Sequence, residues 1–162
     1  MLTAWTQIGI FVGAAILVNL VAWYFKLWKK TYPECNNSFL PPGWFIGLVW
    51  PILFGFFGYA HYLTYKAGKS DEIDSEGGYS AASIAIIVFA VFCLLYPFLV
   101  NHSYKRARIL NLLSFVLAFV VGILVIQVSE DAFWFLIPVI VWTGYVNLAD
   151  YMHMNQSNKC KC

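Results

Sequence analysis

Residues 77–104 read GGYSAASIAIIVFAVFCLLYPFLVNHSY, and this stretch decides the fold because it contains no charged side chain. About 20 mostly apolar residues are enough for an α-helix to cross a bilayer, and this run exceeds that length. A helix of a soluble bundle needs a polar face, which the run lacks. A transmembrane strand would alternate in polarity, and the run does not. The stretch therefore predicts a membrane-spanning helix.

Four more runs without a charged residue flank it, at 1–25, 35–65, 109–129 and 132–149. The start of the second run is polar, so its helix is expected to begin near Trp44. Apolar residues make up 61% of the 162 residues and charged residues 11%, which excludes an ordinary soluble domain and a disordered chain.

The sequence thus predicts an all-α integral membrane protein, a bundle of five transmembrane helices. We expect a single domain over residues 1–162, with spans at about 4–25, 44–65, 79–101, 109–129 and 132–150 and a polar C-terminal tail at 151–162. A signal peptide is the alternative for the first run. That run has no basic start, Asn19 and Trp23 interrupt its end, and no small-residue cleavage site precedes Lys26. We therefore expect a retained first helix.

The basic residues predict the orientation. The side that holds the N-terminus has two of them, Lys66 and Lys69, together with six acidic residues. The opposite side has eight, which are Lys26, Lys29, Lys30, Lys105, Arg106, Arg108, Lys159 and Lys161. Under the positive-inside rule, the N-terminus lies outside and the C-terminus in the cytosol.

Catalytic and metal-binding patterns are lacking in the spans. His61, His102, His153 and Asp150 are far apart in the sequence and show no ligand spacing, so we assign no metal site. No phosphate-binding loop or nucleophile elbow is present, and we assign no catalytic residue. His61 is expected to hydrogen-bond between helices. Ten scattered Lys and Arg residues predict no nucleic-acid partner.

The cysteines divide into two groups. Cys93 lies mid-span and is expected to be a small apolar filler. Cys160 and Cys162 end the chain, where a reduced tail, palmitoylation and weak metal binding are the alternatives.

Aromatic residues form 19% of the chain. Those near span ends are expected to form interfacial belts, and they are Trp5, Trp23, Tyr24, Trp28, Tyr65 and Tyr104. Trp50 and Trp142 lie deeper, where an indole N–H needs a partner, so each faces other helices or a pocket for a flat apolar ligand.

Prolines and small residues shape the expected packing. Pro51, Pro97 and Pro138 lie within spans, where a proline bends or loosens a helix. Two small-residue stripes, Gly9-x-x-x-Gly13 and Ala81-x-x-x-Ala85, allow helices to approach within one chain or in a homodimer.

Residues 39–50, FLPPGWFIGLVW, resemble the signature of the translocator protein family, also called tryptophan-rich sensory proteins or peripheral benzodiazepine receptors. Residues 58–63 are similar to a second family pattern, and residues 96–99 with Lys105 and Arg106 to a third. Pro138, Trp142 and Asp150 fall where the family has Pro, Trp and Asn. The resemblance implies a five-helix bundle, often dimeric, with a pocket under the first loop.

The resemblance also implies site residues. Trp50 and Trp142 would line the pocket, Pro41, Pro42 and Trp44 would shape the loop that leads into the second helix, and Val146 would take a small-residue pocket position. Phe92 replaces the family's pocket amide, Tyr96 stands near a family tryptophan position, and Pro138 and Asp150 complete the fifth-span pattern. Loss of the amide predicts weaker binding of the family's usual synthetic ligands.

Ligands of the family are porphyrins, haem and, in animal members, cholesterol. The resemblance therefore implies a receptor- or transporter-like protein that binds a tetrapyrrole or sterol and requires no cofactor. The alternatives are a membrane enzyme acting on a lipophilic substrate, by porphyrin photodegradation or sterol isomerisation, and a scaffold without ligand. The expected membrane is the mitochondrial outer membrane in a eukaryote or the inner cell membrane in a bacterium.

Overall fold

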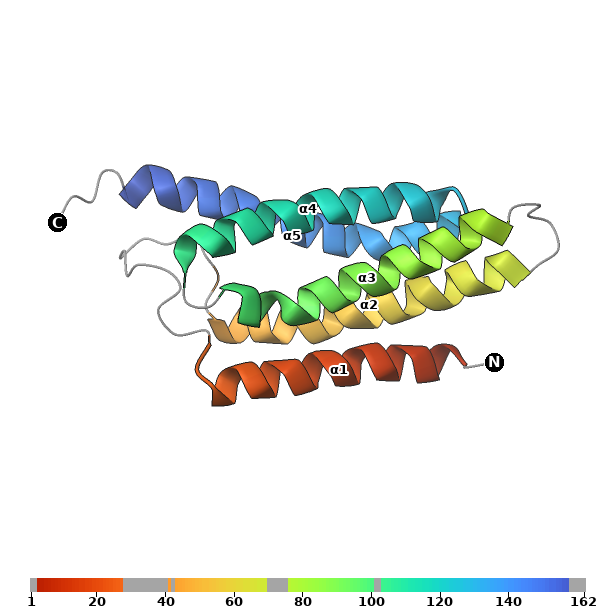
Figure 1. Ribbon diagram of the computed structural model, residues 1–162, viewed down its shortest axis with the longest axis horizontal. Coiled ribbons are helices and arrows are strands. Elements are labelled where there is room, and N and C mark those ends of the chain that lie inside the picture. The colour runs from red at the N-terminus through yellow and green to blue at the C-terminus, as the bar shows by residue number, and fades with distance from the viewer. Residues whose placement is uncertain (1–2, 28–40, 42, 70–75, 101–102, 158–162) are drawn as a thin grey trace.

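The computed structural model describes residues 3–27, 41, 43–69, 76–100 and 103–157. In this part of the chain the regular structure is entirely helical: α1 spans Ala4–Tyr24, α2 Gly43–Lys69, α3 Glu76–Val100, α4 Tyr104–Ile126 and α5 Glu130–Ser157 (Figure 1). Each helix contains a stretch long and apolar enough to cross a membrane. The all-α fold with five candidate spans is therefore confirmed.

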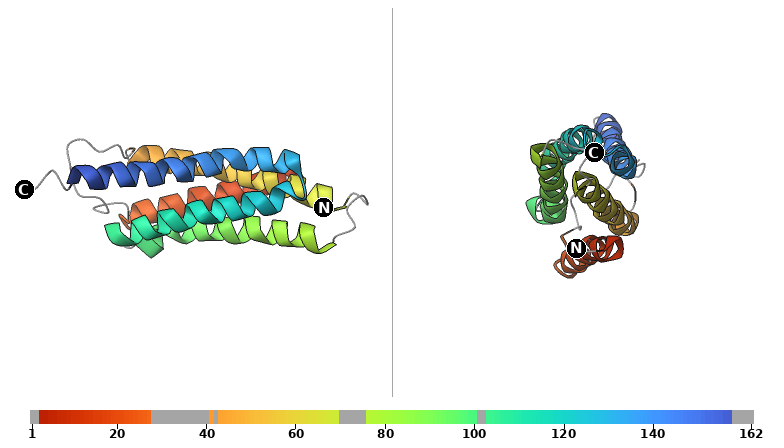
Figure 2. Two further views of the ribbon diagram at one scale, coloured as in Figure 1. Left: turned by 90° about the horizontal axis from the view of Figure 1, so that it is seen from above. Right: turned by 90° about the vertical axis from the view of Figure 1, so that its right-hand side faces the viewer.

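Four of the helices form a closed ring and α1 lies outside it. Contacts run from α2 to α3, from α3 to α4, from α4 to α5 and from α5 back to α2, while α1 packs mainly on α2 and only slightly on α3 (Figure 2). The start of α1, the end of α2, the start of α3 and the α4–α5 turn lie at one end of the bundle, and the end of α5 lies at the other (Figure 1). The helix ends are thus grouped as the orientation prediction assumed when it assigned the basic residues to two sides. Which of the two sides faces the cytosol stays a prediction.

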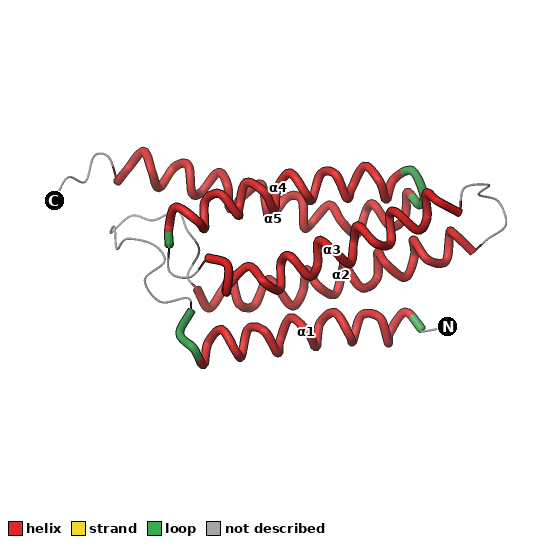
Figure 3. The backbone as a smooth tube through the Cα atoms, viewed as in Figure 1, coloured by secondary structure: helices red, strands yellow, loops and turns green. Residues whose placement is uncertain are grey.

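Hydroxyl side chains begin three of the helices. Thr3, Ser103 and Ser129 each accept a hydrogen bond from a backbone N–H in the first turn of α1, α4 and α5, at 3.3, 3.4 and 3.2 Å. Such caps satisfy amides that have no partner inside the helix. The turn that joins α4 to α5 at Ser129 is short (Figure 3).

The end of α1 is closed by a Schellman motif. Lys26 has a positive φ of 55°, and the N–H groups of Lys26 and Leu27 donate to the carbonyls of Trp23 and Ala22 at 3.0 and 2.9 Å. Glycine is the usual residue at this left-handed position because it has no Cβ. The chain therefore turns sharply at the basic residue that ends the first apolar run.

Several helices extend beyond the apolar runs. Tyr104 begins α4, five residues before the expected start at 109, so Arg106 and Arg108 lie in the first turns of the helix. Residues 151–157, expected in a polar tail, continue α5. Charged and polar residues limit how far a helix enters lipid, but they do not stop helix formation, because long basic side chains can extend to the interface.

Close backbone contact joins α1 to α2 at Gly58. A Cβ added to Gly58 would lie 2.8 Å from Cα of Ile8, which leaves room only for glycine. One turn further along α2, Nδ1 of His61 lies 2.7 Å from Oε1 of Gln7, a hydrogen bond that confirms the expected interhelical role of His61. By contrast, Gly9 and Gly13 have open space around them, so the described chain does not use this stripe for its own packing.

Several aromatic side chains near the helix ends face outward, whereas Tyr65 and Tyr104, also expected in the belt, are half-buried. Trp5, Trp23 and Tyr24 are largely exposed, as expected for an interfacial belt, and Trp134 at the start of α5 joins them. Trp28, also expected in the belt, lies outside the described residues.

Candidate ligand-binding site

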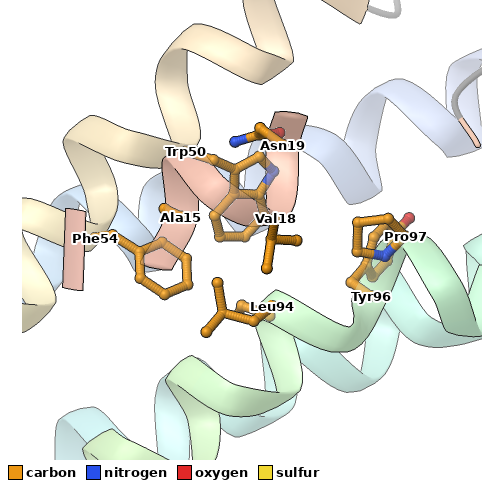
Figure 4. Close-up of a pocket in the computed structure, with 9 residues that line it drawn as sticks. Ala15, Val18, Asn19, Trp50, Phe54, Leu94, Tyr96 and Pro97 are labelled. Atoms are coloured by element: carbon orange, nitrogen blue, oxygen red, sulfur yellow. The ribbon is translucent and has the colours of Figure 1, made fainter. Parts of the chain in front are cut away.

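A small cavity lies between α1, α2 and α3. Its lining residues are Ala15, Val18 and Asn19 from α1, Trp50 and Phe54 from α2, and Cys93, Leu94, Tyr96 and Pro97 from α3 (Figure 4). The cavity volume is about 20 Å³, enough for a water molecule. All nine lining residues are uncharged.

Aromatic contacts and a proline shape this cavity. The Trp50 ring packs against Phe54 with 6.1 Å between ring centroids, and Phe54 packs in turn against Phe57. Pro97 has no N–H to donate to the carbonyl of Cys93, so α3 lacks one helical hydrogen bond where it borders the cavity. Cys93 belongs to the buried core, in agreement with its expected filler role.

A chain of polar side chains connects the cavity wall to α5. The hydroxyl of Tyr96 donates to Oδ1 of Asn111 on α4 at 2.6 Å, and Nδ2 of Asn111 donates to Oδ2 of Asp150 at 2.5 Å. Asn147 donates to the backbone carbonyl of Asn111 at 2.9 Å. Asp150 is 2% exposed, so the hydrogen bond from Asn111 stabilises a carboxyl group inside the bundle. The hydrogen bonds from Tyr96 to Asn111 and from Asn111 to Asp150 thereby join α3, α4 and α5.

Trp142 lies apart from the cavity lining. Its ring is 6.1 Å from that of Phe45 and 5.7 Å from that of Tyr145, measured between centroids. Its indole nitrogen is buried and has no hydrogen-bond partner among the described residues. Phe45 and Trp50 are five residues apart on α2, about 140° around the helix, so Trp142 packs on a different side of α2 from the side that carries Trp50. The structure thus brings Trp50 and Tyr96 to one cavity and places Trp142 elsewhere.

The remaining residues suggested by the resemblance are spread over the bundle. Trp44 is 72% exposed and packs edge-on against Phe45. Phe92 is partly buried against the core, and Pro138 and Val146 are half-buried in α5. Pro41 is half-buried before α2, and Pro42 lies outside the described residues.

Sequence reasoning did not assign Asn19 or Asn111 to a site. The available signal was a polar amide within an apolar span, where a side chain of this kind needs a hydrogen-bond partner. Hydropathy indicates that such an amide is unusual, but it does not indicate which helix the amide faces. The described residues contain no group of three or more His, Cys, Asp or Glu side chains placed to hold a metal ion.

Five helices long and apolar enough to cross a membrane, with a cavity between the first three of them, define a multi-pass integral membrane protein. The chain belongs to the TspO/MBR family, whose match extends over residues 2–154 and includes all the lining residues of the cavity. The comparison with curated proteins gave no match, and neither did the comparison with solved structures.

Proposed function

We propose that this protein binds a planar hydrophobic ligand, a tetrapyrrole or a sterol, between its helices, with Trp50 at the binding site. The observation that carries the proposal is the cavity itself, which is lined by Trp50 from α2 and Tyr96 from α3, both within candidate membrane spans. Aromatic faces of this kind suit a flat apolar molecule. The family membership supports the same general role.

Binding requires the helices to move. Pockets for small molecules have volumes of about 300–1,000 Å³, whereas this cavity measures about 20 Å³. Because α1 packs on α2 and touches α3 only slightly, separation of α1 from α3 breaks few contacts. The proposal therefore includes a widening of the cavity along the border between α1 and α3.

Trp142 provides a second point of contact in this proposal. Its buried N–H lacks an acceptor among the described residues, and a buried donor without a partner costs about 1–3 kcal/mol. A ligand that reaches around α2 would supply the acceptor. Both tryptophans of the family pattern would then contact the ligand, from two sides of the same helix.

A porphyrin titration of the purified protein tests the proposal. Bound porphyrin should quench tryptophan fluorescence with saturation. Trp50→Ala and Trp142→Ala should each weaken binding roughly tenfold, which is about 1.4 kcal/mol. Trp5→Ala is the matched control because Trp5 is exposed at the end of α1, and it should leave binding unchanged. Equal affinity in all four proteins would contradict the proposal, and porphyrin breakdown products under light would favour an enzyme.

A further inference from the structure

The part of α3 that borders the cavity contains a weak point in the helix. Pro97 cannot donate to the carbonyl of Cys93, and both residues line the cavity together with Tyr96 (Figure 4). A helix bends or rotates more easily where such a hydrogen bond is missing. On the other side of the cavity, α1 touches α3 only slightly and does little to hold this segment. The position of the Tyr96 ring therefore depends on contacts with other helices.

The described hydrogen bond that fixes Tyr96 comes from α4. Its hydroxyl donates to Oδ1 of Asn111 at 2.6 Å, so the hydroxyl is directed to α4 while the residue lines the cavity. An unpaired hydroxyl inside a bilayer is unfavourable, which couples the orientation of the ring to this hydrogen bond. Asn111 is itself held by α5, because Nδ2 donates to Asp150 and the backbone carbonyl accepts from Asn147.

The partners of Asn111 determine which way its amide faces. An amide has a donor end and an acceptor end, and a rotation by 180° exchanges them. An acceptor at position 150 holds Nδ2 toward α5 and leaves Oδ1 for Tyr96. Neither Asn111 nor Asp150 is among the described residues that line the cavity. Their influence on the cavity therefore passes through Tyr96.

From these features we infer that Asn111 and Asp150 are positioning residues of the cavity. They hold the Tyr96 ring in the cavity wall at the point where Pro97 weakens α3, and they do so without touching a ligand. α3 is then the wall that stays in place, and α1 is the wall that moves. The effect on ligand affinity rests on the proposed function, whereas the effect on the wall does not.

Reactivity of the Cys93 thiol tests the wall without any ligand. Cys35→Ser, Cys160→Ser and Cys162→Ser leave Cys93 as the single thiol of the chain. The protein in detergent is treated with methyl methanethiosulfonate, a small uncharged thiol reagent, and labelling is followed by mass. Cys93 is 6% exposed, so the reagent reaches it when the wall opens. Loss of the hydrogen-bonded chain in Tyr96→Phe or Asp150→Ala should speed labelling about fivefold.

Matched variants separate positioning from general destabilisation. Asp150→Asn keeps an acceptor oxygen for Asn111 and should label at the rate of the parent protein. Ser114→Ala is the control, since the Ser114 hydroxyl, one turn from Asn111, donates to the carbonyl of Leu110 within α4, and it should also leave the rate unchanged. The double variant Tyr96→Phe/Asp150→Ala should react no faster than either single variant, because both break the same chain.

The affinity for protoporphyrin IX should follow the same pattern. Tyr96→Phe and Asp150→Ala should each weaken binding about fivefold, because a wall that must become ordered on binding lowers the affinity. The double variant should bind no more weakly than the single variants, and Asp150→Asn should bind like the parent protein.

Each other outcome has a definite meaning. Equal Cys93 rates in all variants, or additive rates in the double variant, overturn the inference. An Asp150→Asn rate as high as that of Asp150→Ala also overturns it, because the acceptor oxygen is then not sufficient. Faster labelling with unchanged affinity overturns the role in binding. A parent protein that does not bind protoporphyrin IX removes the proposed function, whereas the thiol rates still decide whether Asn111 and Asp150 position the wall.

Discussion

Asp150 is a carboxyl group almost completely enclosed by protein, and the Asn111 amide is its described hydrogen-bond donor. The same amide accepts from Tyr96, so the orientation of the Asn111 side chain depends on Asp150. An acceptor at position 150 keeps the nitrogen of Asn111 toward α5 and its oxygen toward Tyr96. Position 150 therefore needs a side chain with an acceptor oxygen. The hydrogen bond from Asn111 does not require that this oxygen carries a negative charge.

Two substitutions at Asp150 separate these requirements. Asp150→Asn keeps an acceptor oxygen for Asn111 and should lower the free energy of unfolding by less than about 1 kcal/mol. Asp150→Ala leaves the Asn111 amide without its acceptor and should cost about 1–3 kcal/mol. Thermal unfolding of the purified protein in detergent measures both. Equal destabilisation by the two variants would contradict this account and would assign the stability to the charge.

At the scale of elements, the contact between α1 and α2 depends on one glycine. A methyl group on Gly58 would meet the backbone of Ile8, which cannot move without moving α1. Gly58→Ala should therefore destabilise the protein by about 2 kcal/mol, as overpacking commonly does. Because Asn19 lies on the same helix, the substitution should also weaken ligand binding.

Gly9→Ala is the control for Gly58→Ala. Gly9 lies on the neighbouring helix, and no atom is within 4 Å of its added Cβ. In an open helical position alanine is favoured over glycine by about 0.5–1 kcal/mol, so this variant should be unchanged or slightly more stable. If Gly58→Ala melts at the same temperature as Gly9→Ala, the close approach of α1 and α2 does not contribute to stability.

At the scale of the whole molecule, the basic residues predict which end of the bundle faces the cytosol. In intact cells or organelles, a membrane-impermeant thiol reagent added from outside should label a cysteine introduced at Asp71 and should not label Cys160. Both positions lie outside the described residues, and their location is expected from the charge bias alone. Labelling of Cys160 without labelling at position 71 would reverse the topology.

The number of helices could be predicted because lipid leaves the backbone no other partners, so each charge-free run forms a helix. The helix ends were less predictable, since residues such as Arg106 continue α4 although they do not belong in hydrocarbon. The neighbours of Asn19 could not be predicted at all. Apart from polar residues such as Gln7 and Asn19, α1 is apolar on every side, so its sequence does not determine which face turns toward α2. The same limit applies to Trp142, whose position relative to α2 depends on the rotation of α5.

The position of α1 outside the ring has a consequence for synthesis of the protein. All residues that line the cavity lie between Ala15 and Pro97, whereas the ring closes only through contacts between α2 and α5. During translation the first three helices therefore emerge with every lining residue before α4 and α5 exist. The proposed binding site therefore belongs to the part of the chain that is made first. The last two helices then close the ring by packing on α3 and α2.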